Sequence, residues 1–353
     1  MPERKDHLWA GDIQMFSTNS MSIANGACGI SLFLKSVNKA LPEAAERWML
    51  RQVLTNQDIP PGLFPGLAGI AYAFAQLGHC ERGAEVLEEA SRSPIIFAEP
   101  SWFDGAAGWG WVNLFFYRLL GNAEYMSRAM AVGDQILAMA ERKDDLHFWR
   151  RRDDGRIHYG LAYGAAGVCL FLLALFECTG NERYREIAES GVRFELTNAL
   201  PQFGGWGWRR WEADNTIRPY WLYGSAGMTS VLIRYYRALG KQEDLEFSRL
   251  SAQGAFARFS IQPEQFEGLS GIGEAMIDMY LATNEQGYLN KAHDIADSIL
   301  RYRVERPEGL AFPGRLLLRL SNDFGTGAAG VGLFFRRLLC PGPRLLHDLD
   351  ALL

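Results

Sequence analysis

The chain has 353 residues, of which 48% are hydrophobic, and its formal net charge at pH 7 is −5. The apolar share can form a large core, and the acidic balance excludes a strongly basic nucleic-acid-binding surface. No apolar run approaches the roughly 20 residues of a membrane-spanning helix, and the N-terminus carries no signal-peptide pattern. We therefore predict a soluble, cytoplasmic protein that binds neither nucleic acid nor a membrane.

The five cysteines lie far apart in the sequence and include no C-x-x-C pair. They are Cys28, Cys80, Cys169, Cys178 and Cys340. Their odd number and wide spacing predict neither a disulfide framework nor a cysteine-based zinc module. This pattern is typical of a protein from a reducing compartment.

A G-x-x-G frame occurs seven times along the chain. The copies are NGACG at 25–29, PGLAG at 65–69, DGAAG at 104–108, YGAAG at 163–167, YGSAG at 223–227, EGLSG at 267–271 and TGAAG at 326–330. Self-similarity at spacings of about 40 to 60 residues indicates a repeat architecture.

Each frame begins a strongly apolar segment. The segments 106–121, AAGWGWVNLFFYRLLG, and 165–180, AAGVCLFLLALFECTG, are apolar almost all round, which predicts helices buried on both sides. Gly121, Gly180 and Gly240 lie where a left-handed residue would end such helices. The segments that follow, such as 287–306, are amphipathic and predict helices lying outside the first set.

These alternating helices predict an all-α fold, an α/α toroid of seven inner and seven outer helices. Asn25, Asp104 and Thr326 precede their glycines and are expected to cap the inner helices. Strand patterns are nearly absent. An open solenoid is the alternative, but it would expose the apolar inner helices to solvent.

In a closed ring, all seven inner helices would start on one rim, where their positive N-terminal dipoles would favour an anion. The residues before the first glycines face this rim and are the candidates for chemistry. They are Asn25, Pro65, Asp104, Tyr163, Tyr223, Glu267 and Thr326, with Leu222 and Phe266 one position earlier.

The long loop before the fifth frame combines tryptophan with arginine. Such side chains at a cavity mouth suit a peptide or a sugar; alternatively, the tryptophans only plug the end of the ring. The loop residues in question are Trp206, Trp208, Arg209, Arg210 and Trp211.

The seven frames together, with LAYGAAG at 161–167, WLYGSAG at 221–227 and FEGLSG at 266–271, resemble the LanC family of lanthionine cyclases over essentially the whole chain. The resemblance implies an α/α toroid that adds cysteine thiols to dehydroalanine or dehydrobutyrine in a peptide. The N-terminal stretches GDIQMF and SIANGACG are similar to the junction between kinase and cyclase in class III lanthipeptide synthetases. The resemblance thus implies one cyclase domain over 1–353, with 1–20 as a linker from a kinase.

Zinc-dependent members of the family carry a cysteine in W-C-Y-G at the fifth frame and Cys-His before the sixth. This sequence has Leu222, Phe266 and Glu267 at those positions, so no metal or other cofactor is expected. Tyr163 replaces the histidine of the fourth frame. The aspartate of the family lies a few residues before the third glycine, whereas Asp104 is adjacent to it. The pattern is similar to the zinc-free cyclase domains of class III synthetases.

Without zinc, a thiol needs another route to its thiolate. His158 is the candidate base by residue type, and Glu267 is the alternative. Tyr163 and Tyr223 are candidates to protonate the enolate; if labionin forms, a second dehydroalanine is attacked instead. Each candidate also has a structural interpretation. His158 would be an ordinary surface histidine, and Glu267 would accept hydrogen bonds from N–H groups at helix starts. Tyr163 and Tyr223 would pack as the lip of the cavity, and Asp104 would be a helix cap.

The expected partners are a dehydrated precursor peptide and kinase and lyase domains in the same or another chain, and the expected oligomeric state is a monomer. Two other functions stay open. A toroid without zinc ligands could be an inactive module that binds the precursor or scaffolds a kinase or lyase. Ten tryptophans would also fit a carbohydrate-active α/α barrel, which needs two opposed carboxylates, and only Asp104 and Glu267 occupy rim positions.

Overall fold

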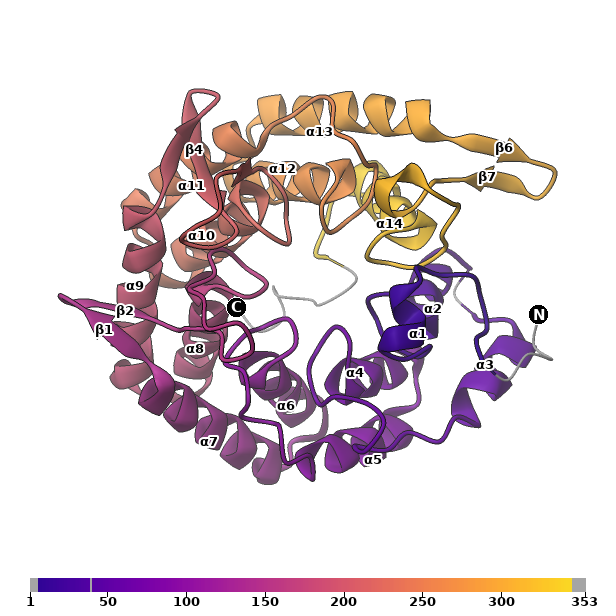
Figure 1. Ribbon diagram of the computed structural model, residues 1–353, viewed down its shortest axis with the longest axis horizontal. Helices are drawn as coiled ribbons and strands as arrows, with labels where there is room; N and C mark the ends of the chain where they lie inside the picture. The colour runs from indigo at the N-terminus through magenta and orange to yellow at the C-terminus, as the bar shows by residue number, and fades with distance from the viewer. Residues whose placement is uncertain (1–5, 39, 345–353) are drawn as a thin grey trace.

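The computed structural model describes residues 6–38 and 40–344, which form two concentric rings of helices (Figure 1). The inner ring consists of α2 (Ala27–Asn38), α4 (Leu67–Leu77), α6 (Ala106–Leu120), α8 (Ala165–Thr179), α10 (Ser225–Leu239), α12 (Leu269–Thr283) and α14 (Ala328–Leu339). The outer ring consists of α3 (Glu43–Leu50), α5 (Cys80–Ser91), α7 (Ala123–Met139), α9 (Glu182–Thr197), α11 (Gln242–Ala255) and α13 (Gln286–Ile299).

The predicted all-α toroid with seven inner helices is confirmed. The seventh outer helix would have to follow α14, where the chain soon reaches residues 345–353, outside the described residues. Each inner helix contacts the next, and α14 contacts α2, so the ring is closed and the open solenoid was the wrong alternative.

The rim of the ring is tied together by main-chain hydrogen bonds. In every frame, the residue two positions before the first glycine donates its N–H to the carbonyl oxygen of the same position in the next frame, at 2.8–3.3 Å between nitrogen and oxygen. The seventh frame donates to the first, which completes a circle. The residues are Ala24, Phe64, Phe103, Ala162, Leu222, Phe266 and Gly325.

The second glycine of each frame allows this close approach. A Cβ added at Gly167 would lie 1.9 Å from the Leu161 carbonyl oxygen and 2.8 Å from Cβ of Trp102 in the preceding frame. The same two kinds of contact, to the carbonyl six residues earlier and to a side chain of the preceding frame, recur at all seven second glycines. Any side chain there would force neighbouring helix starts apart.

The ends of the inner helices agree only in part with the sequence prediction. Gly121, Gly180 and Gly240 take the left-handed conformation and end α6, α8 and α10, as predicted. The predicted N-caps were wrong for Asp104 and Thr326, because the helices begin one residue later and the first glycine of the frame occupies the cap position.

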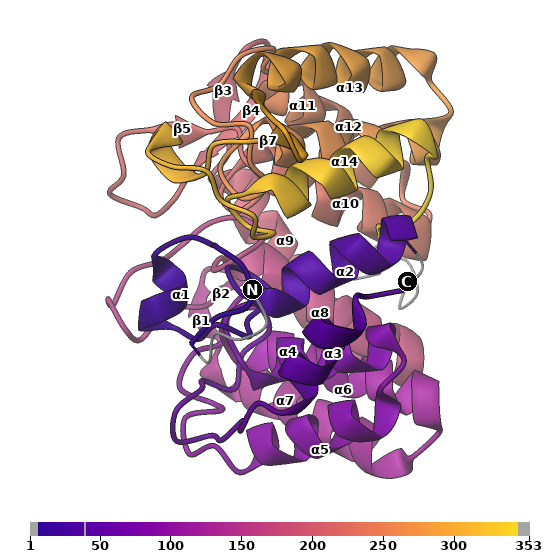
Figure 2. The same ribbon diagram turned by 90° about the vertical axis from the view of Figure 1, so that its right-hand side faces the viewer.

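Three small antiparallel sheets, which were not predicted from the sequence, lie in connections between an outer helix and the next inner helix. They are β1 (Glu141–Lys143) with β2 (Leu146–Phe148), β3 (Leu200–Gln202) with β4 (Gly205–Arg209) and β5 (Ile217–Arg218), and β6 (Val304–Arg306) with β7 (Gly309–Ala311). Figure 2 shows β3–β5 and β7 at the end of the molecule where the inner helices begin. The strands have two to five residues, too few to produce an alternating pattern.

The N-terminal segment also packs on this rim. Helix α1 (Gln14–Ser17) follows Asp12, whose N–H donates to Asp323 at 2.9 Å, and Asn322 donates to the Ala10 carbonyl. The interpretation of 1–20 as a linker did not anticipate this packing, and its first five residues lie outside the described residues.

Aromatic side chains fill the axis of the ring just beneath the rim. The Phe64 ring centroid lies 4.6 Å from that of Phe103, 5.6 Å from that of Phe266 and 6.3 Å from that of Phe324. Trp102 and Trp221 pack against the same group at 5.4 and 5.8 Å from Phe64. We refer to these six residues as the aromatic plug.

A buried ionic cluster is carried by α10, α12, α14 and the segment that follows α14. Asp278 contacts Arg234, Arg337 and Arg344 at 3.1, 2.6 and 2.8 Å. Burial alone would raise the pKa of Asp278, but the three guanidinium groups hold it well below its usual range. Arg344 also lies over the Trp221 ring, 5.7 Å from its centroid, so the cluster borders the aromatic plug. Within the described residues, no helix combines the length and apolarity needed to cross a membrane.

The close approach at the second glycine can be tested by adding one methyl group. We expect Gly167→Ala to lower the free energy of unfolding by about 3 kcal/mol or more, because the new Cβ overlaps a main-chain oxygen. The matched control is Gly287→Ala in α13, where no atom lies within 4 Å of the added Cβ, and its stability should be unchanged or slightly higher. Urea denaturation measures both; equal effects would contradict the packing argument.

Candidate functional site

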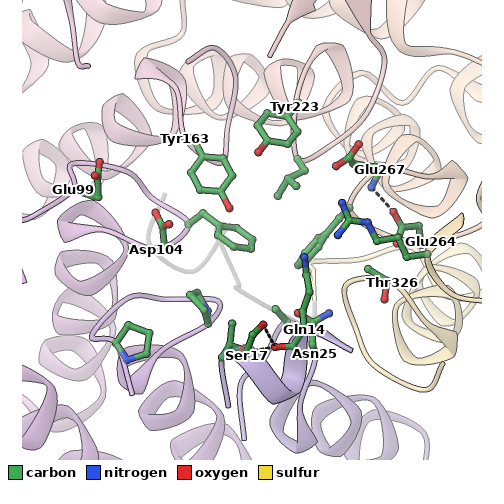
Figure 3. A pocket seen from close by; sticks show the side chains of 18 of the residues that line it. Gln14, Ser17, Asn25, Glu99, Asp104, Tyr163, Tyr223, Glu264, Glu267 and Thr326 are labelled. Atoms are coloured by element: carbon green, nitrogen blue, oxygen red, sulfur yellow. Dashed lines mark hydrogen bonds between the residues drawn. The ribbon is translucent and has the colours of Figure 1, made fainter. Parts of the chain in front are cut away.

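A cavity of about 580 Å³ lies on the axis of the ring, where the inner helices begin (Figure 3). Phe103 and Phe266 of the aromatic plug, together with Leu222, contribute apolar lining. The residues before the first glycines all line this cavity. They are Asn25, Pro65, Asp104, Tyr163, Tyr223, Glu267 and Thr326. The repeat therefore delivers one side chain from each of the seven frames to one chamber.

Two tyrosines and an ion pair form one wall of the cavity. The rings of Tyr163 and Tyr223 stack with centroids 5.5 Å apart. Arg151 lies over the Tyr163 ring at 4.6 Å and binds both carboxylate oxygens of Asp104, at 2.9 and 3.3 Å. Asp104 is thus the partner of Arg151, and also of Ser101, instead of a helix cap.

The environment of the two tyrosines keeps their hydroxyl groups protonated. Burial, with the nearby charge of Asp104, raises the pKa of Tyr163 well above its usual range. Burial and the charge of Glu267 raise the pKa of Tyr223 to about 12. At neutral pH both side chains are hydrogen-bond donors, and neither gives up its proton readily.

Two glutamates, Glu267 and Glu264, lie beyond Tyr223, on the side of the cavity away from Asp104 (Figure 3). Among the described residues, the carboxylate of Glu267 has no hydrogen-bond or ion-pair partner. Its main-chain N–H donates to Oε1 of Glu264 at 3.0 Å. Glu264 is only 2% exposed, and burial, followed by the charges of Glu267 and Asp323, raises its pKa to about 8.

Glu264, Glu99 and Arg151 were not predicted from the sequence. Glu264 lies four residues before the sixth frame's first glycine, a position that carries a polar side chain in several frames and could have drawn attention to it. Glu99 and Arg151 lie in connections of irregular length, and the pairing of Arg151 with Asp104 spans 47 residues. No local pattern could have revealed it.

His158 lies behind the tyrosine wall. It is buried, its Nε2 lies 2.8 Å from a carboxylate oxygen of Asp154, and its ring centroid is 6.0 Å from that of Tyr163. It is not part of the cavity lining. The position of His158 in the sequence does not show whether its side chain faces the cavity. In the structure it does not, and Glu267 lines the cavity instead.

The tryptophan- and arginine-rich loop does not reach the cavity lining either. Trp208 is completely buried and donates its indole N–H to the Glu195 carbonyl at 2.8 Å, while Trp206 stacks on Phe247 of α11. Arg209 ends β4 and pairs with Ile217 of β5. Of the substrate-binding residues expected from sequence, only Leu222 and Phe266 line the cavity.

Two members of this loop come nearer to the cavity wall. Arg210 lies 4.3 Å from the Trp211 ring centroid and 5.7 Å from that of Tyr223. Its Nε donates to Asp214 at 3.3 Å. Arg210 therefore lies between the Trp211 and Tyr223 rings and packs against both.

The sequence matches the model of the lanthionine synthetase C-like protein family over residues 17–350. The chain belongs to this family. A curated relative, the probable SapB synthase of Streptomyces coelicolor, is 30% identical over 353 residues; the match covers 97% of this chain and 37% of the relative. The chain therefore spans little more than a third of the length of that relative.

Solved structures with a similar fold include nisin cyclase and an alpha-1,6-mannanase. Nisin cyclase superposes with a TM-score of 0.71 at 15% identity, covering 95% of this chain and 92% of that one. An alpha-1,6-mannanase of Salegentibacter sp. HEL1_6 gives a TM-score of 0.58 at 15% identity, covering 89% and 99%. At these identities the likeness shows a shared fold and no shared activity.

The side chains at the family's zinc positions do not fit a zinc ion. Leu222 and Phe266 carry no ligating atom, so Glu267 would be the sole protein ligand where such sites use three or four. The part of the chain that the structure describes holds no group of three His, Cys, Asp or Glu side chains placed to bind a metal.

The Asp104–Arg151 pair should stabilise the cavity wall. Replacing Arg151 with Met leaves a largely buried carboxylate without its bidentate partner, and we expect the free energy of unfolding to fall by about 1–2 kcal/mol. The double variant Arg151→Met, Asp104→Asn should recover part of this loss. As a control, Arg142→Met breaks an exposed pair with Asp145 and should change nothing measurable in urea denaturation. A double variant no more stable than the single one would contradict this account.

Proposed function

We propose that the chain is a lanthipeptide cyclase domain that acts without zinc, as in class III synthetases. Its reaction adds cysteine thiols of a dehydrated precursor peptide to dehydroalanine or dehydrobutyrine, giving lanthionine or labionin rings. The observation that carries the proposal is a family toroid whose seven frames line one cavity, with Leu222, Phe266 and Glu267 at the positions of the zinc ligands.

Glu267 is the best-placed base for the thiol. A cysteine thiol has a pKa of about 8.5, so a metal-free site needs a group that accepts its proton. Glu267 lines the cavity, and its carboxylate has no partner among residues 6–38 and 40–344, whereas His158 is buried behind Tyr163 and bonded to Asp154. In this scheme the S–H proton moves to Glu267 as sulfur bonds to the dehydroalanine β-carbon.

The π electrons of the attacked double bond then move toward the neighbouring amide carbonyl and form an enolate. Tyr163 and Tyr223 line the cavity as protonated phenols, so they are suited to donate hydrogen bonds to that oxygen. The N-termini of the inner helices add a positive field at the same place. Proton delivery to the α-carbon completes the addition.

The partners follow from this chemistry. A chain that only cyclises must receive a peptide already dehydrated, which needs kinase and lyase domains in the same or another chain; the greater length of the SapB synthase relative is consistent with this. We further propose one domain over 1–353 that works as a monomer in the cytoplasm.

A thiol count tests the proposed function. A panel of synthetic peptides, each with one cysteine and one dehydroalanine at a different spacing, is incubated with the chain and a metal chelator. Remaining thiols are then alkylated and measured by mass spectrometry. We expect thiols to disappear faster than in the uncatalysed control. Bound peptide with unchanged thiols would instead identify the inactive scaffold that missing zinc ligands also allow.

The choice of base has its own test. We expect Glu267→Gln to lower the cyclisation rate about a hundredfold, because the amide cannot accept the thiol proton. His158→Gln should leave the rate within about threefold of the parent, because His158 does not line the cavity. The reverse ranking, with the histidine variant slower, would assign the base to His158.

A further inference from the structure

A polar side chain four residues before the first glycine recurs in several frames. In four frames this side chain accepts a hydrogen bond from the N–H of the residue before the glycine. The acceptors are Ser22, Ser101, Glu264 and Asp323, at 3.2, 3.3, 3.0 and 2.7 Å. The contact shapes the turn that leads into the inner helix, and a serine hydroxyl is sufficient for it.

Glu264 has a second carboxyl oxygen, Oε2, that this turn does not use. Its Oε1 accepts the N–H of Glu267 and a weaker bond from Gln262 at 3.3 Å. Its Oε2 is buried and has no hydrogen-bond partner in the part of the chain that the structure describes. The side chain lines the cavity, which already holds Glu267 and the two tyrosines.

Asp323 at the same position of the seventh frame is different. Its Oδ1 accepts from the N–H of Thr326 and its Oδ2 from the N–H of Asp12, at 2.7 and 2.9 Å. Both oxygens are therefore occupied by structural contacts, and Asp323 is not part of the cavity lining. Of these two carboxyl groups, only that of Glu264 belongs to a residue that lines the cavity, and only it has an oxygen without a hydrogen-bond partner among the described residues.

We propose that Glu264 is the acid that protonates the α-carbon of the enolate, an inference that rests on the proposed cyclase function. The O–H bond at Oε2 breaks and a C–H bond forms at the α-carbon, which leaves Glu264 as a carboxylate. The proton that Glu267 took from the thiol then returns to Glu264 through the shared site. The balance is one S–H and one C=C consumed, and one C–S and one C–H formed.

The surroundings of Glu264 suit this role. A buried carboxyl oxygen without a partner favours the protonated form, because an isolated negative charge there is costly. The charged groups that act on it are Glu267 on its own loop, Asp323 on the loop before α14, and Arg315 of η2 (Arg315–Leu317). Burial raises the pKa of Glu264 most, and the two carboxylates raise it further. The hydrogen bond from the N–H of Glu267 and the charge of Arg315 lower it, leaving a value of about 8.

The test uses the whole chain and the same peptide panel, with three readouts: cyclisation rate, pH profile, and the ratio of lanthionine diastereomers after hydrolysis. We expect Glu264→Gln to lower the rate about a hundredfold and to give mixed configuration at the α-carbon, because protonation from solvent is not confined to one face. The parent rate should fall as the pH rises through about 8, where the acid loses its proton, and the Gln variant should lack this fall.

The control is Asp323→Asn, which alters the equivalent turn away from the cavity. It should lower thermal stability and leave the diastereomer ratio as in the parent. The fall in rate should move to a lower pH, because Asp323 is one of the two carboxylates that raise the pKa of Glu264. Because the glutamine variant could fail to fold, the high-pH limb of the unaltered protein is an independent measurement.

The outcomes distinguish failure of the proposed function from failure of the inference about Glu264. A parent that binds peptide but consumes no thiols overturns the proposed function and this inference together. An active parent whose Glu264→Gln variant keeps the parent rate and one diastereomer overturns the inference alone. An active parent whose rate does not fall above pH 8 also overturns it.

Discussion

The closed circle of seven main-chain hydrogen bonds is the constraint on which the rest of the structure depends. Each frame donates one N–H and accepts one, so no frame can shift without breaking two bonds in a buried region. The circle brings neighbouring helix starts into contact. The second glycine permits this contact, because a carbonyl oxygen and a neighbouring side chain occupy the space that a Cβ would need. The G-x-x-G frame therefore serves the architecture, and the chemistry comes from its flanking residues.

The same circle of hydrogen bonds fixes where the side chains of the residues before each first glycine point. The residue two before the glycine makes the main-chain bond whatever its side chain, which is why Leu222 and Phe266 can stand where zinc-dependent members carry cysteine. The residue three before packs toward the axis, as Trp102 and Trp221 do. The residue one before faces the cavity. A site on this scaffold can thus change its chemistry one residue at a time while the ring stays intact.

Features set by local sequence were predicted correctly, whereas contacts between distant parts of the chain were not. The inner helices, their glycine ends and the cavity-lining residue before the first glycine of each frame were predictable, because period, polarity and left-handed glycines are local properties. The assignment of Asp104 as a cap failed by one position, since the glycine itself occupies the cap. Arg151, Trp208 and His158 were beyond prediction, because their partners are set by the course of long connections whose length varies between frames.

The electrostatics of the cavity are consistent with the metal-free thiol addition that we propose. Glu99, Asp104, Glu264 and Glu267 all line it, a concentration of carboxylates that would repel one another in an apolar pocket. Seven helix N-termini point toward the same space and offset part of that repulsion. The most deeply buried of the four, Glu264, nevertheless favours its protonated form, whereas Glu267 stands unpaired at the cavity wall. In the mechanism that we propose, one chamber therefore holds a proton acceptor, Glu267, and a proton donor, Glu264, three residues apart in the chain.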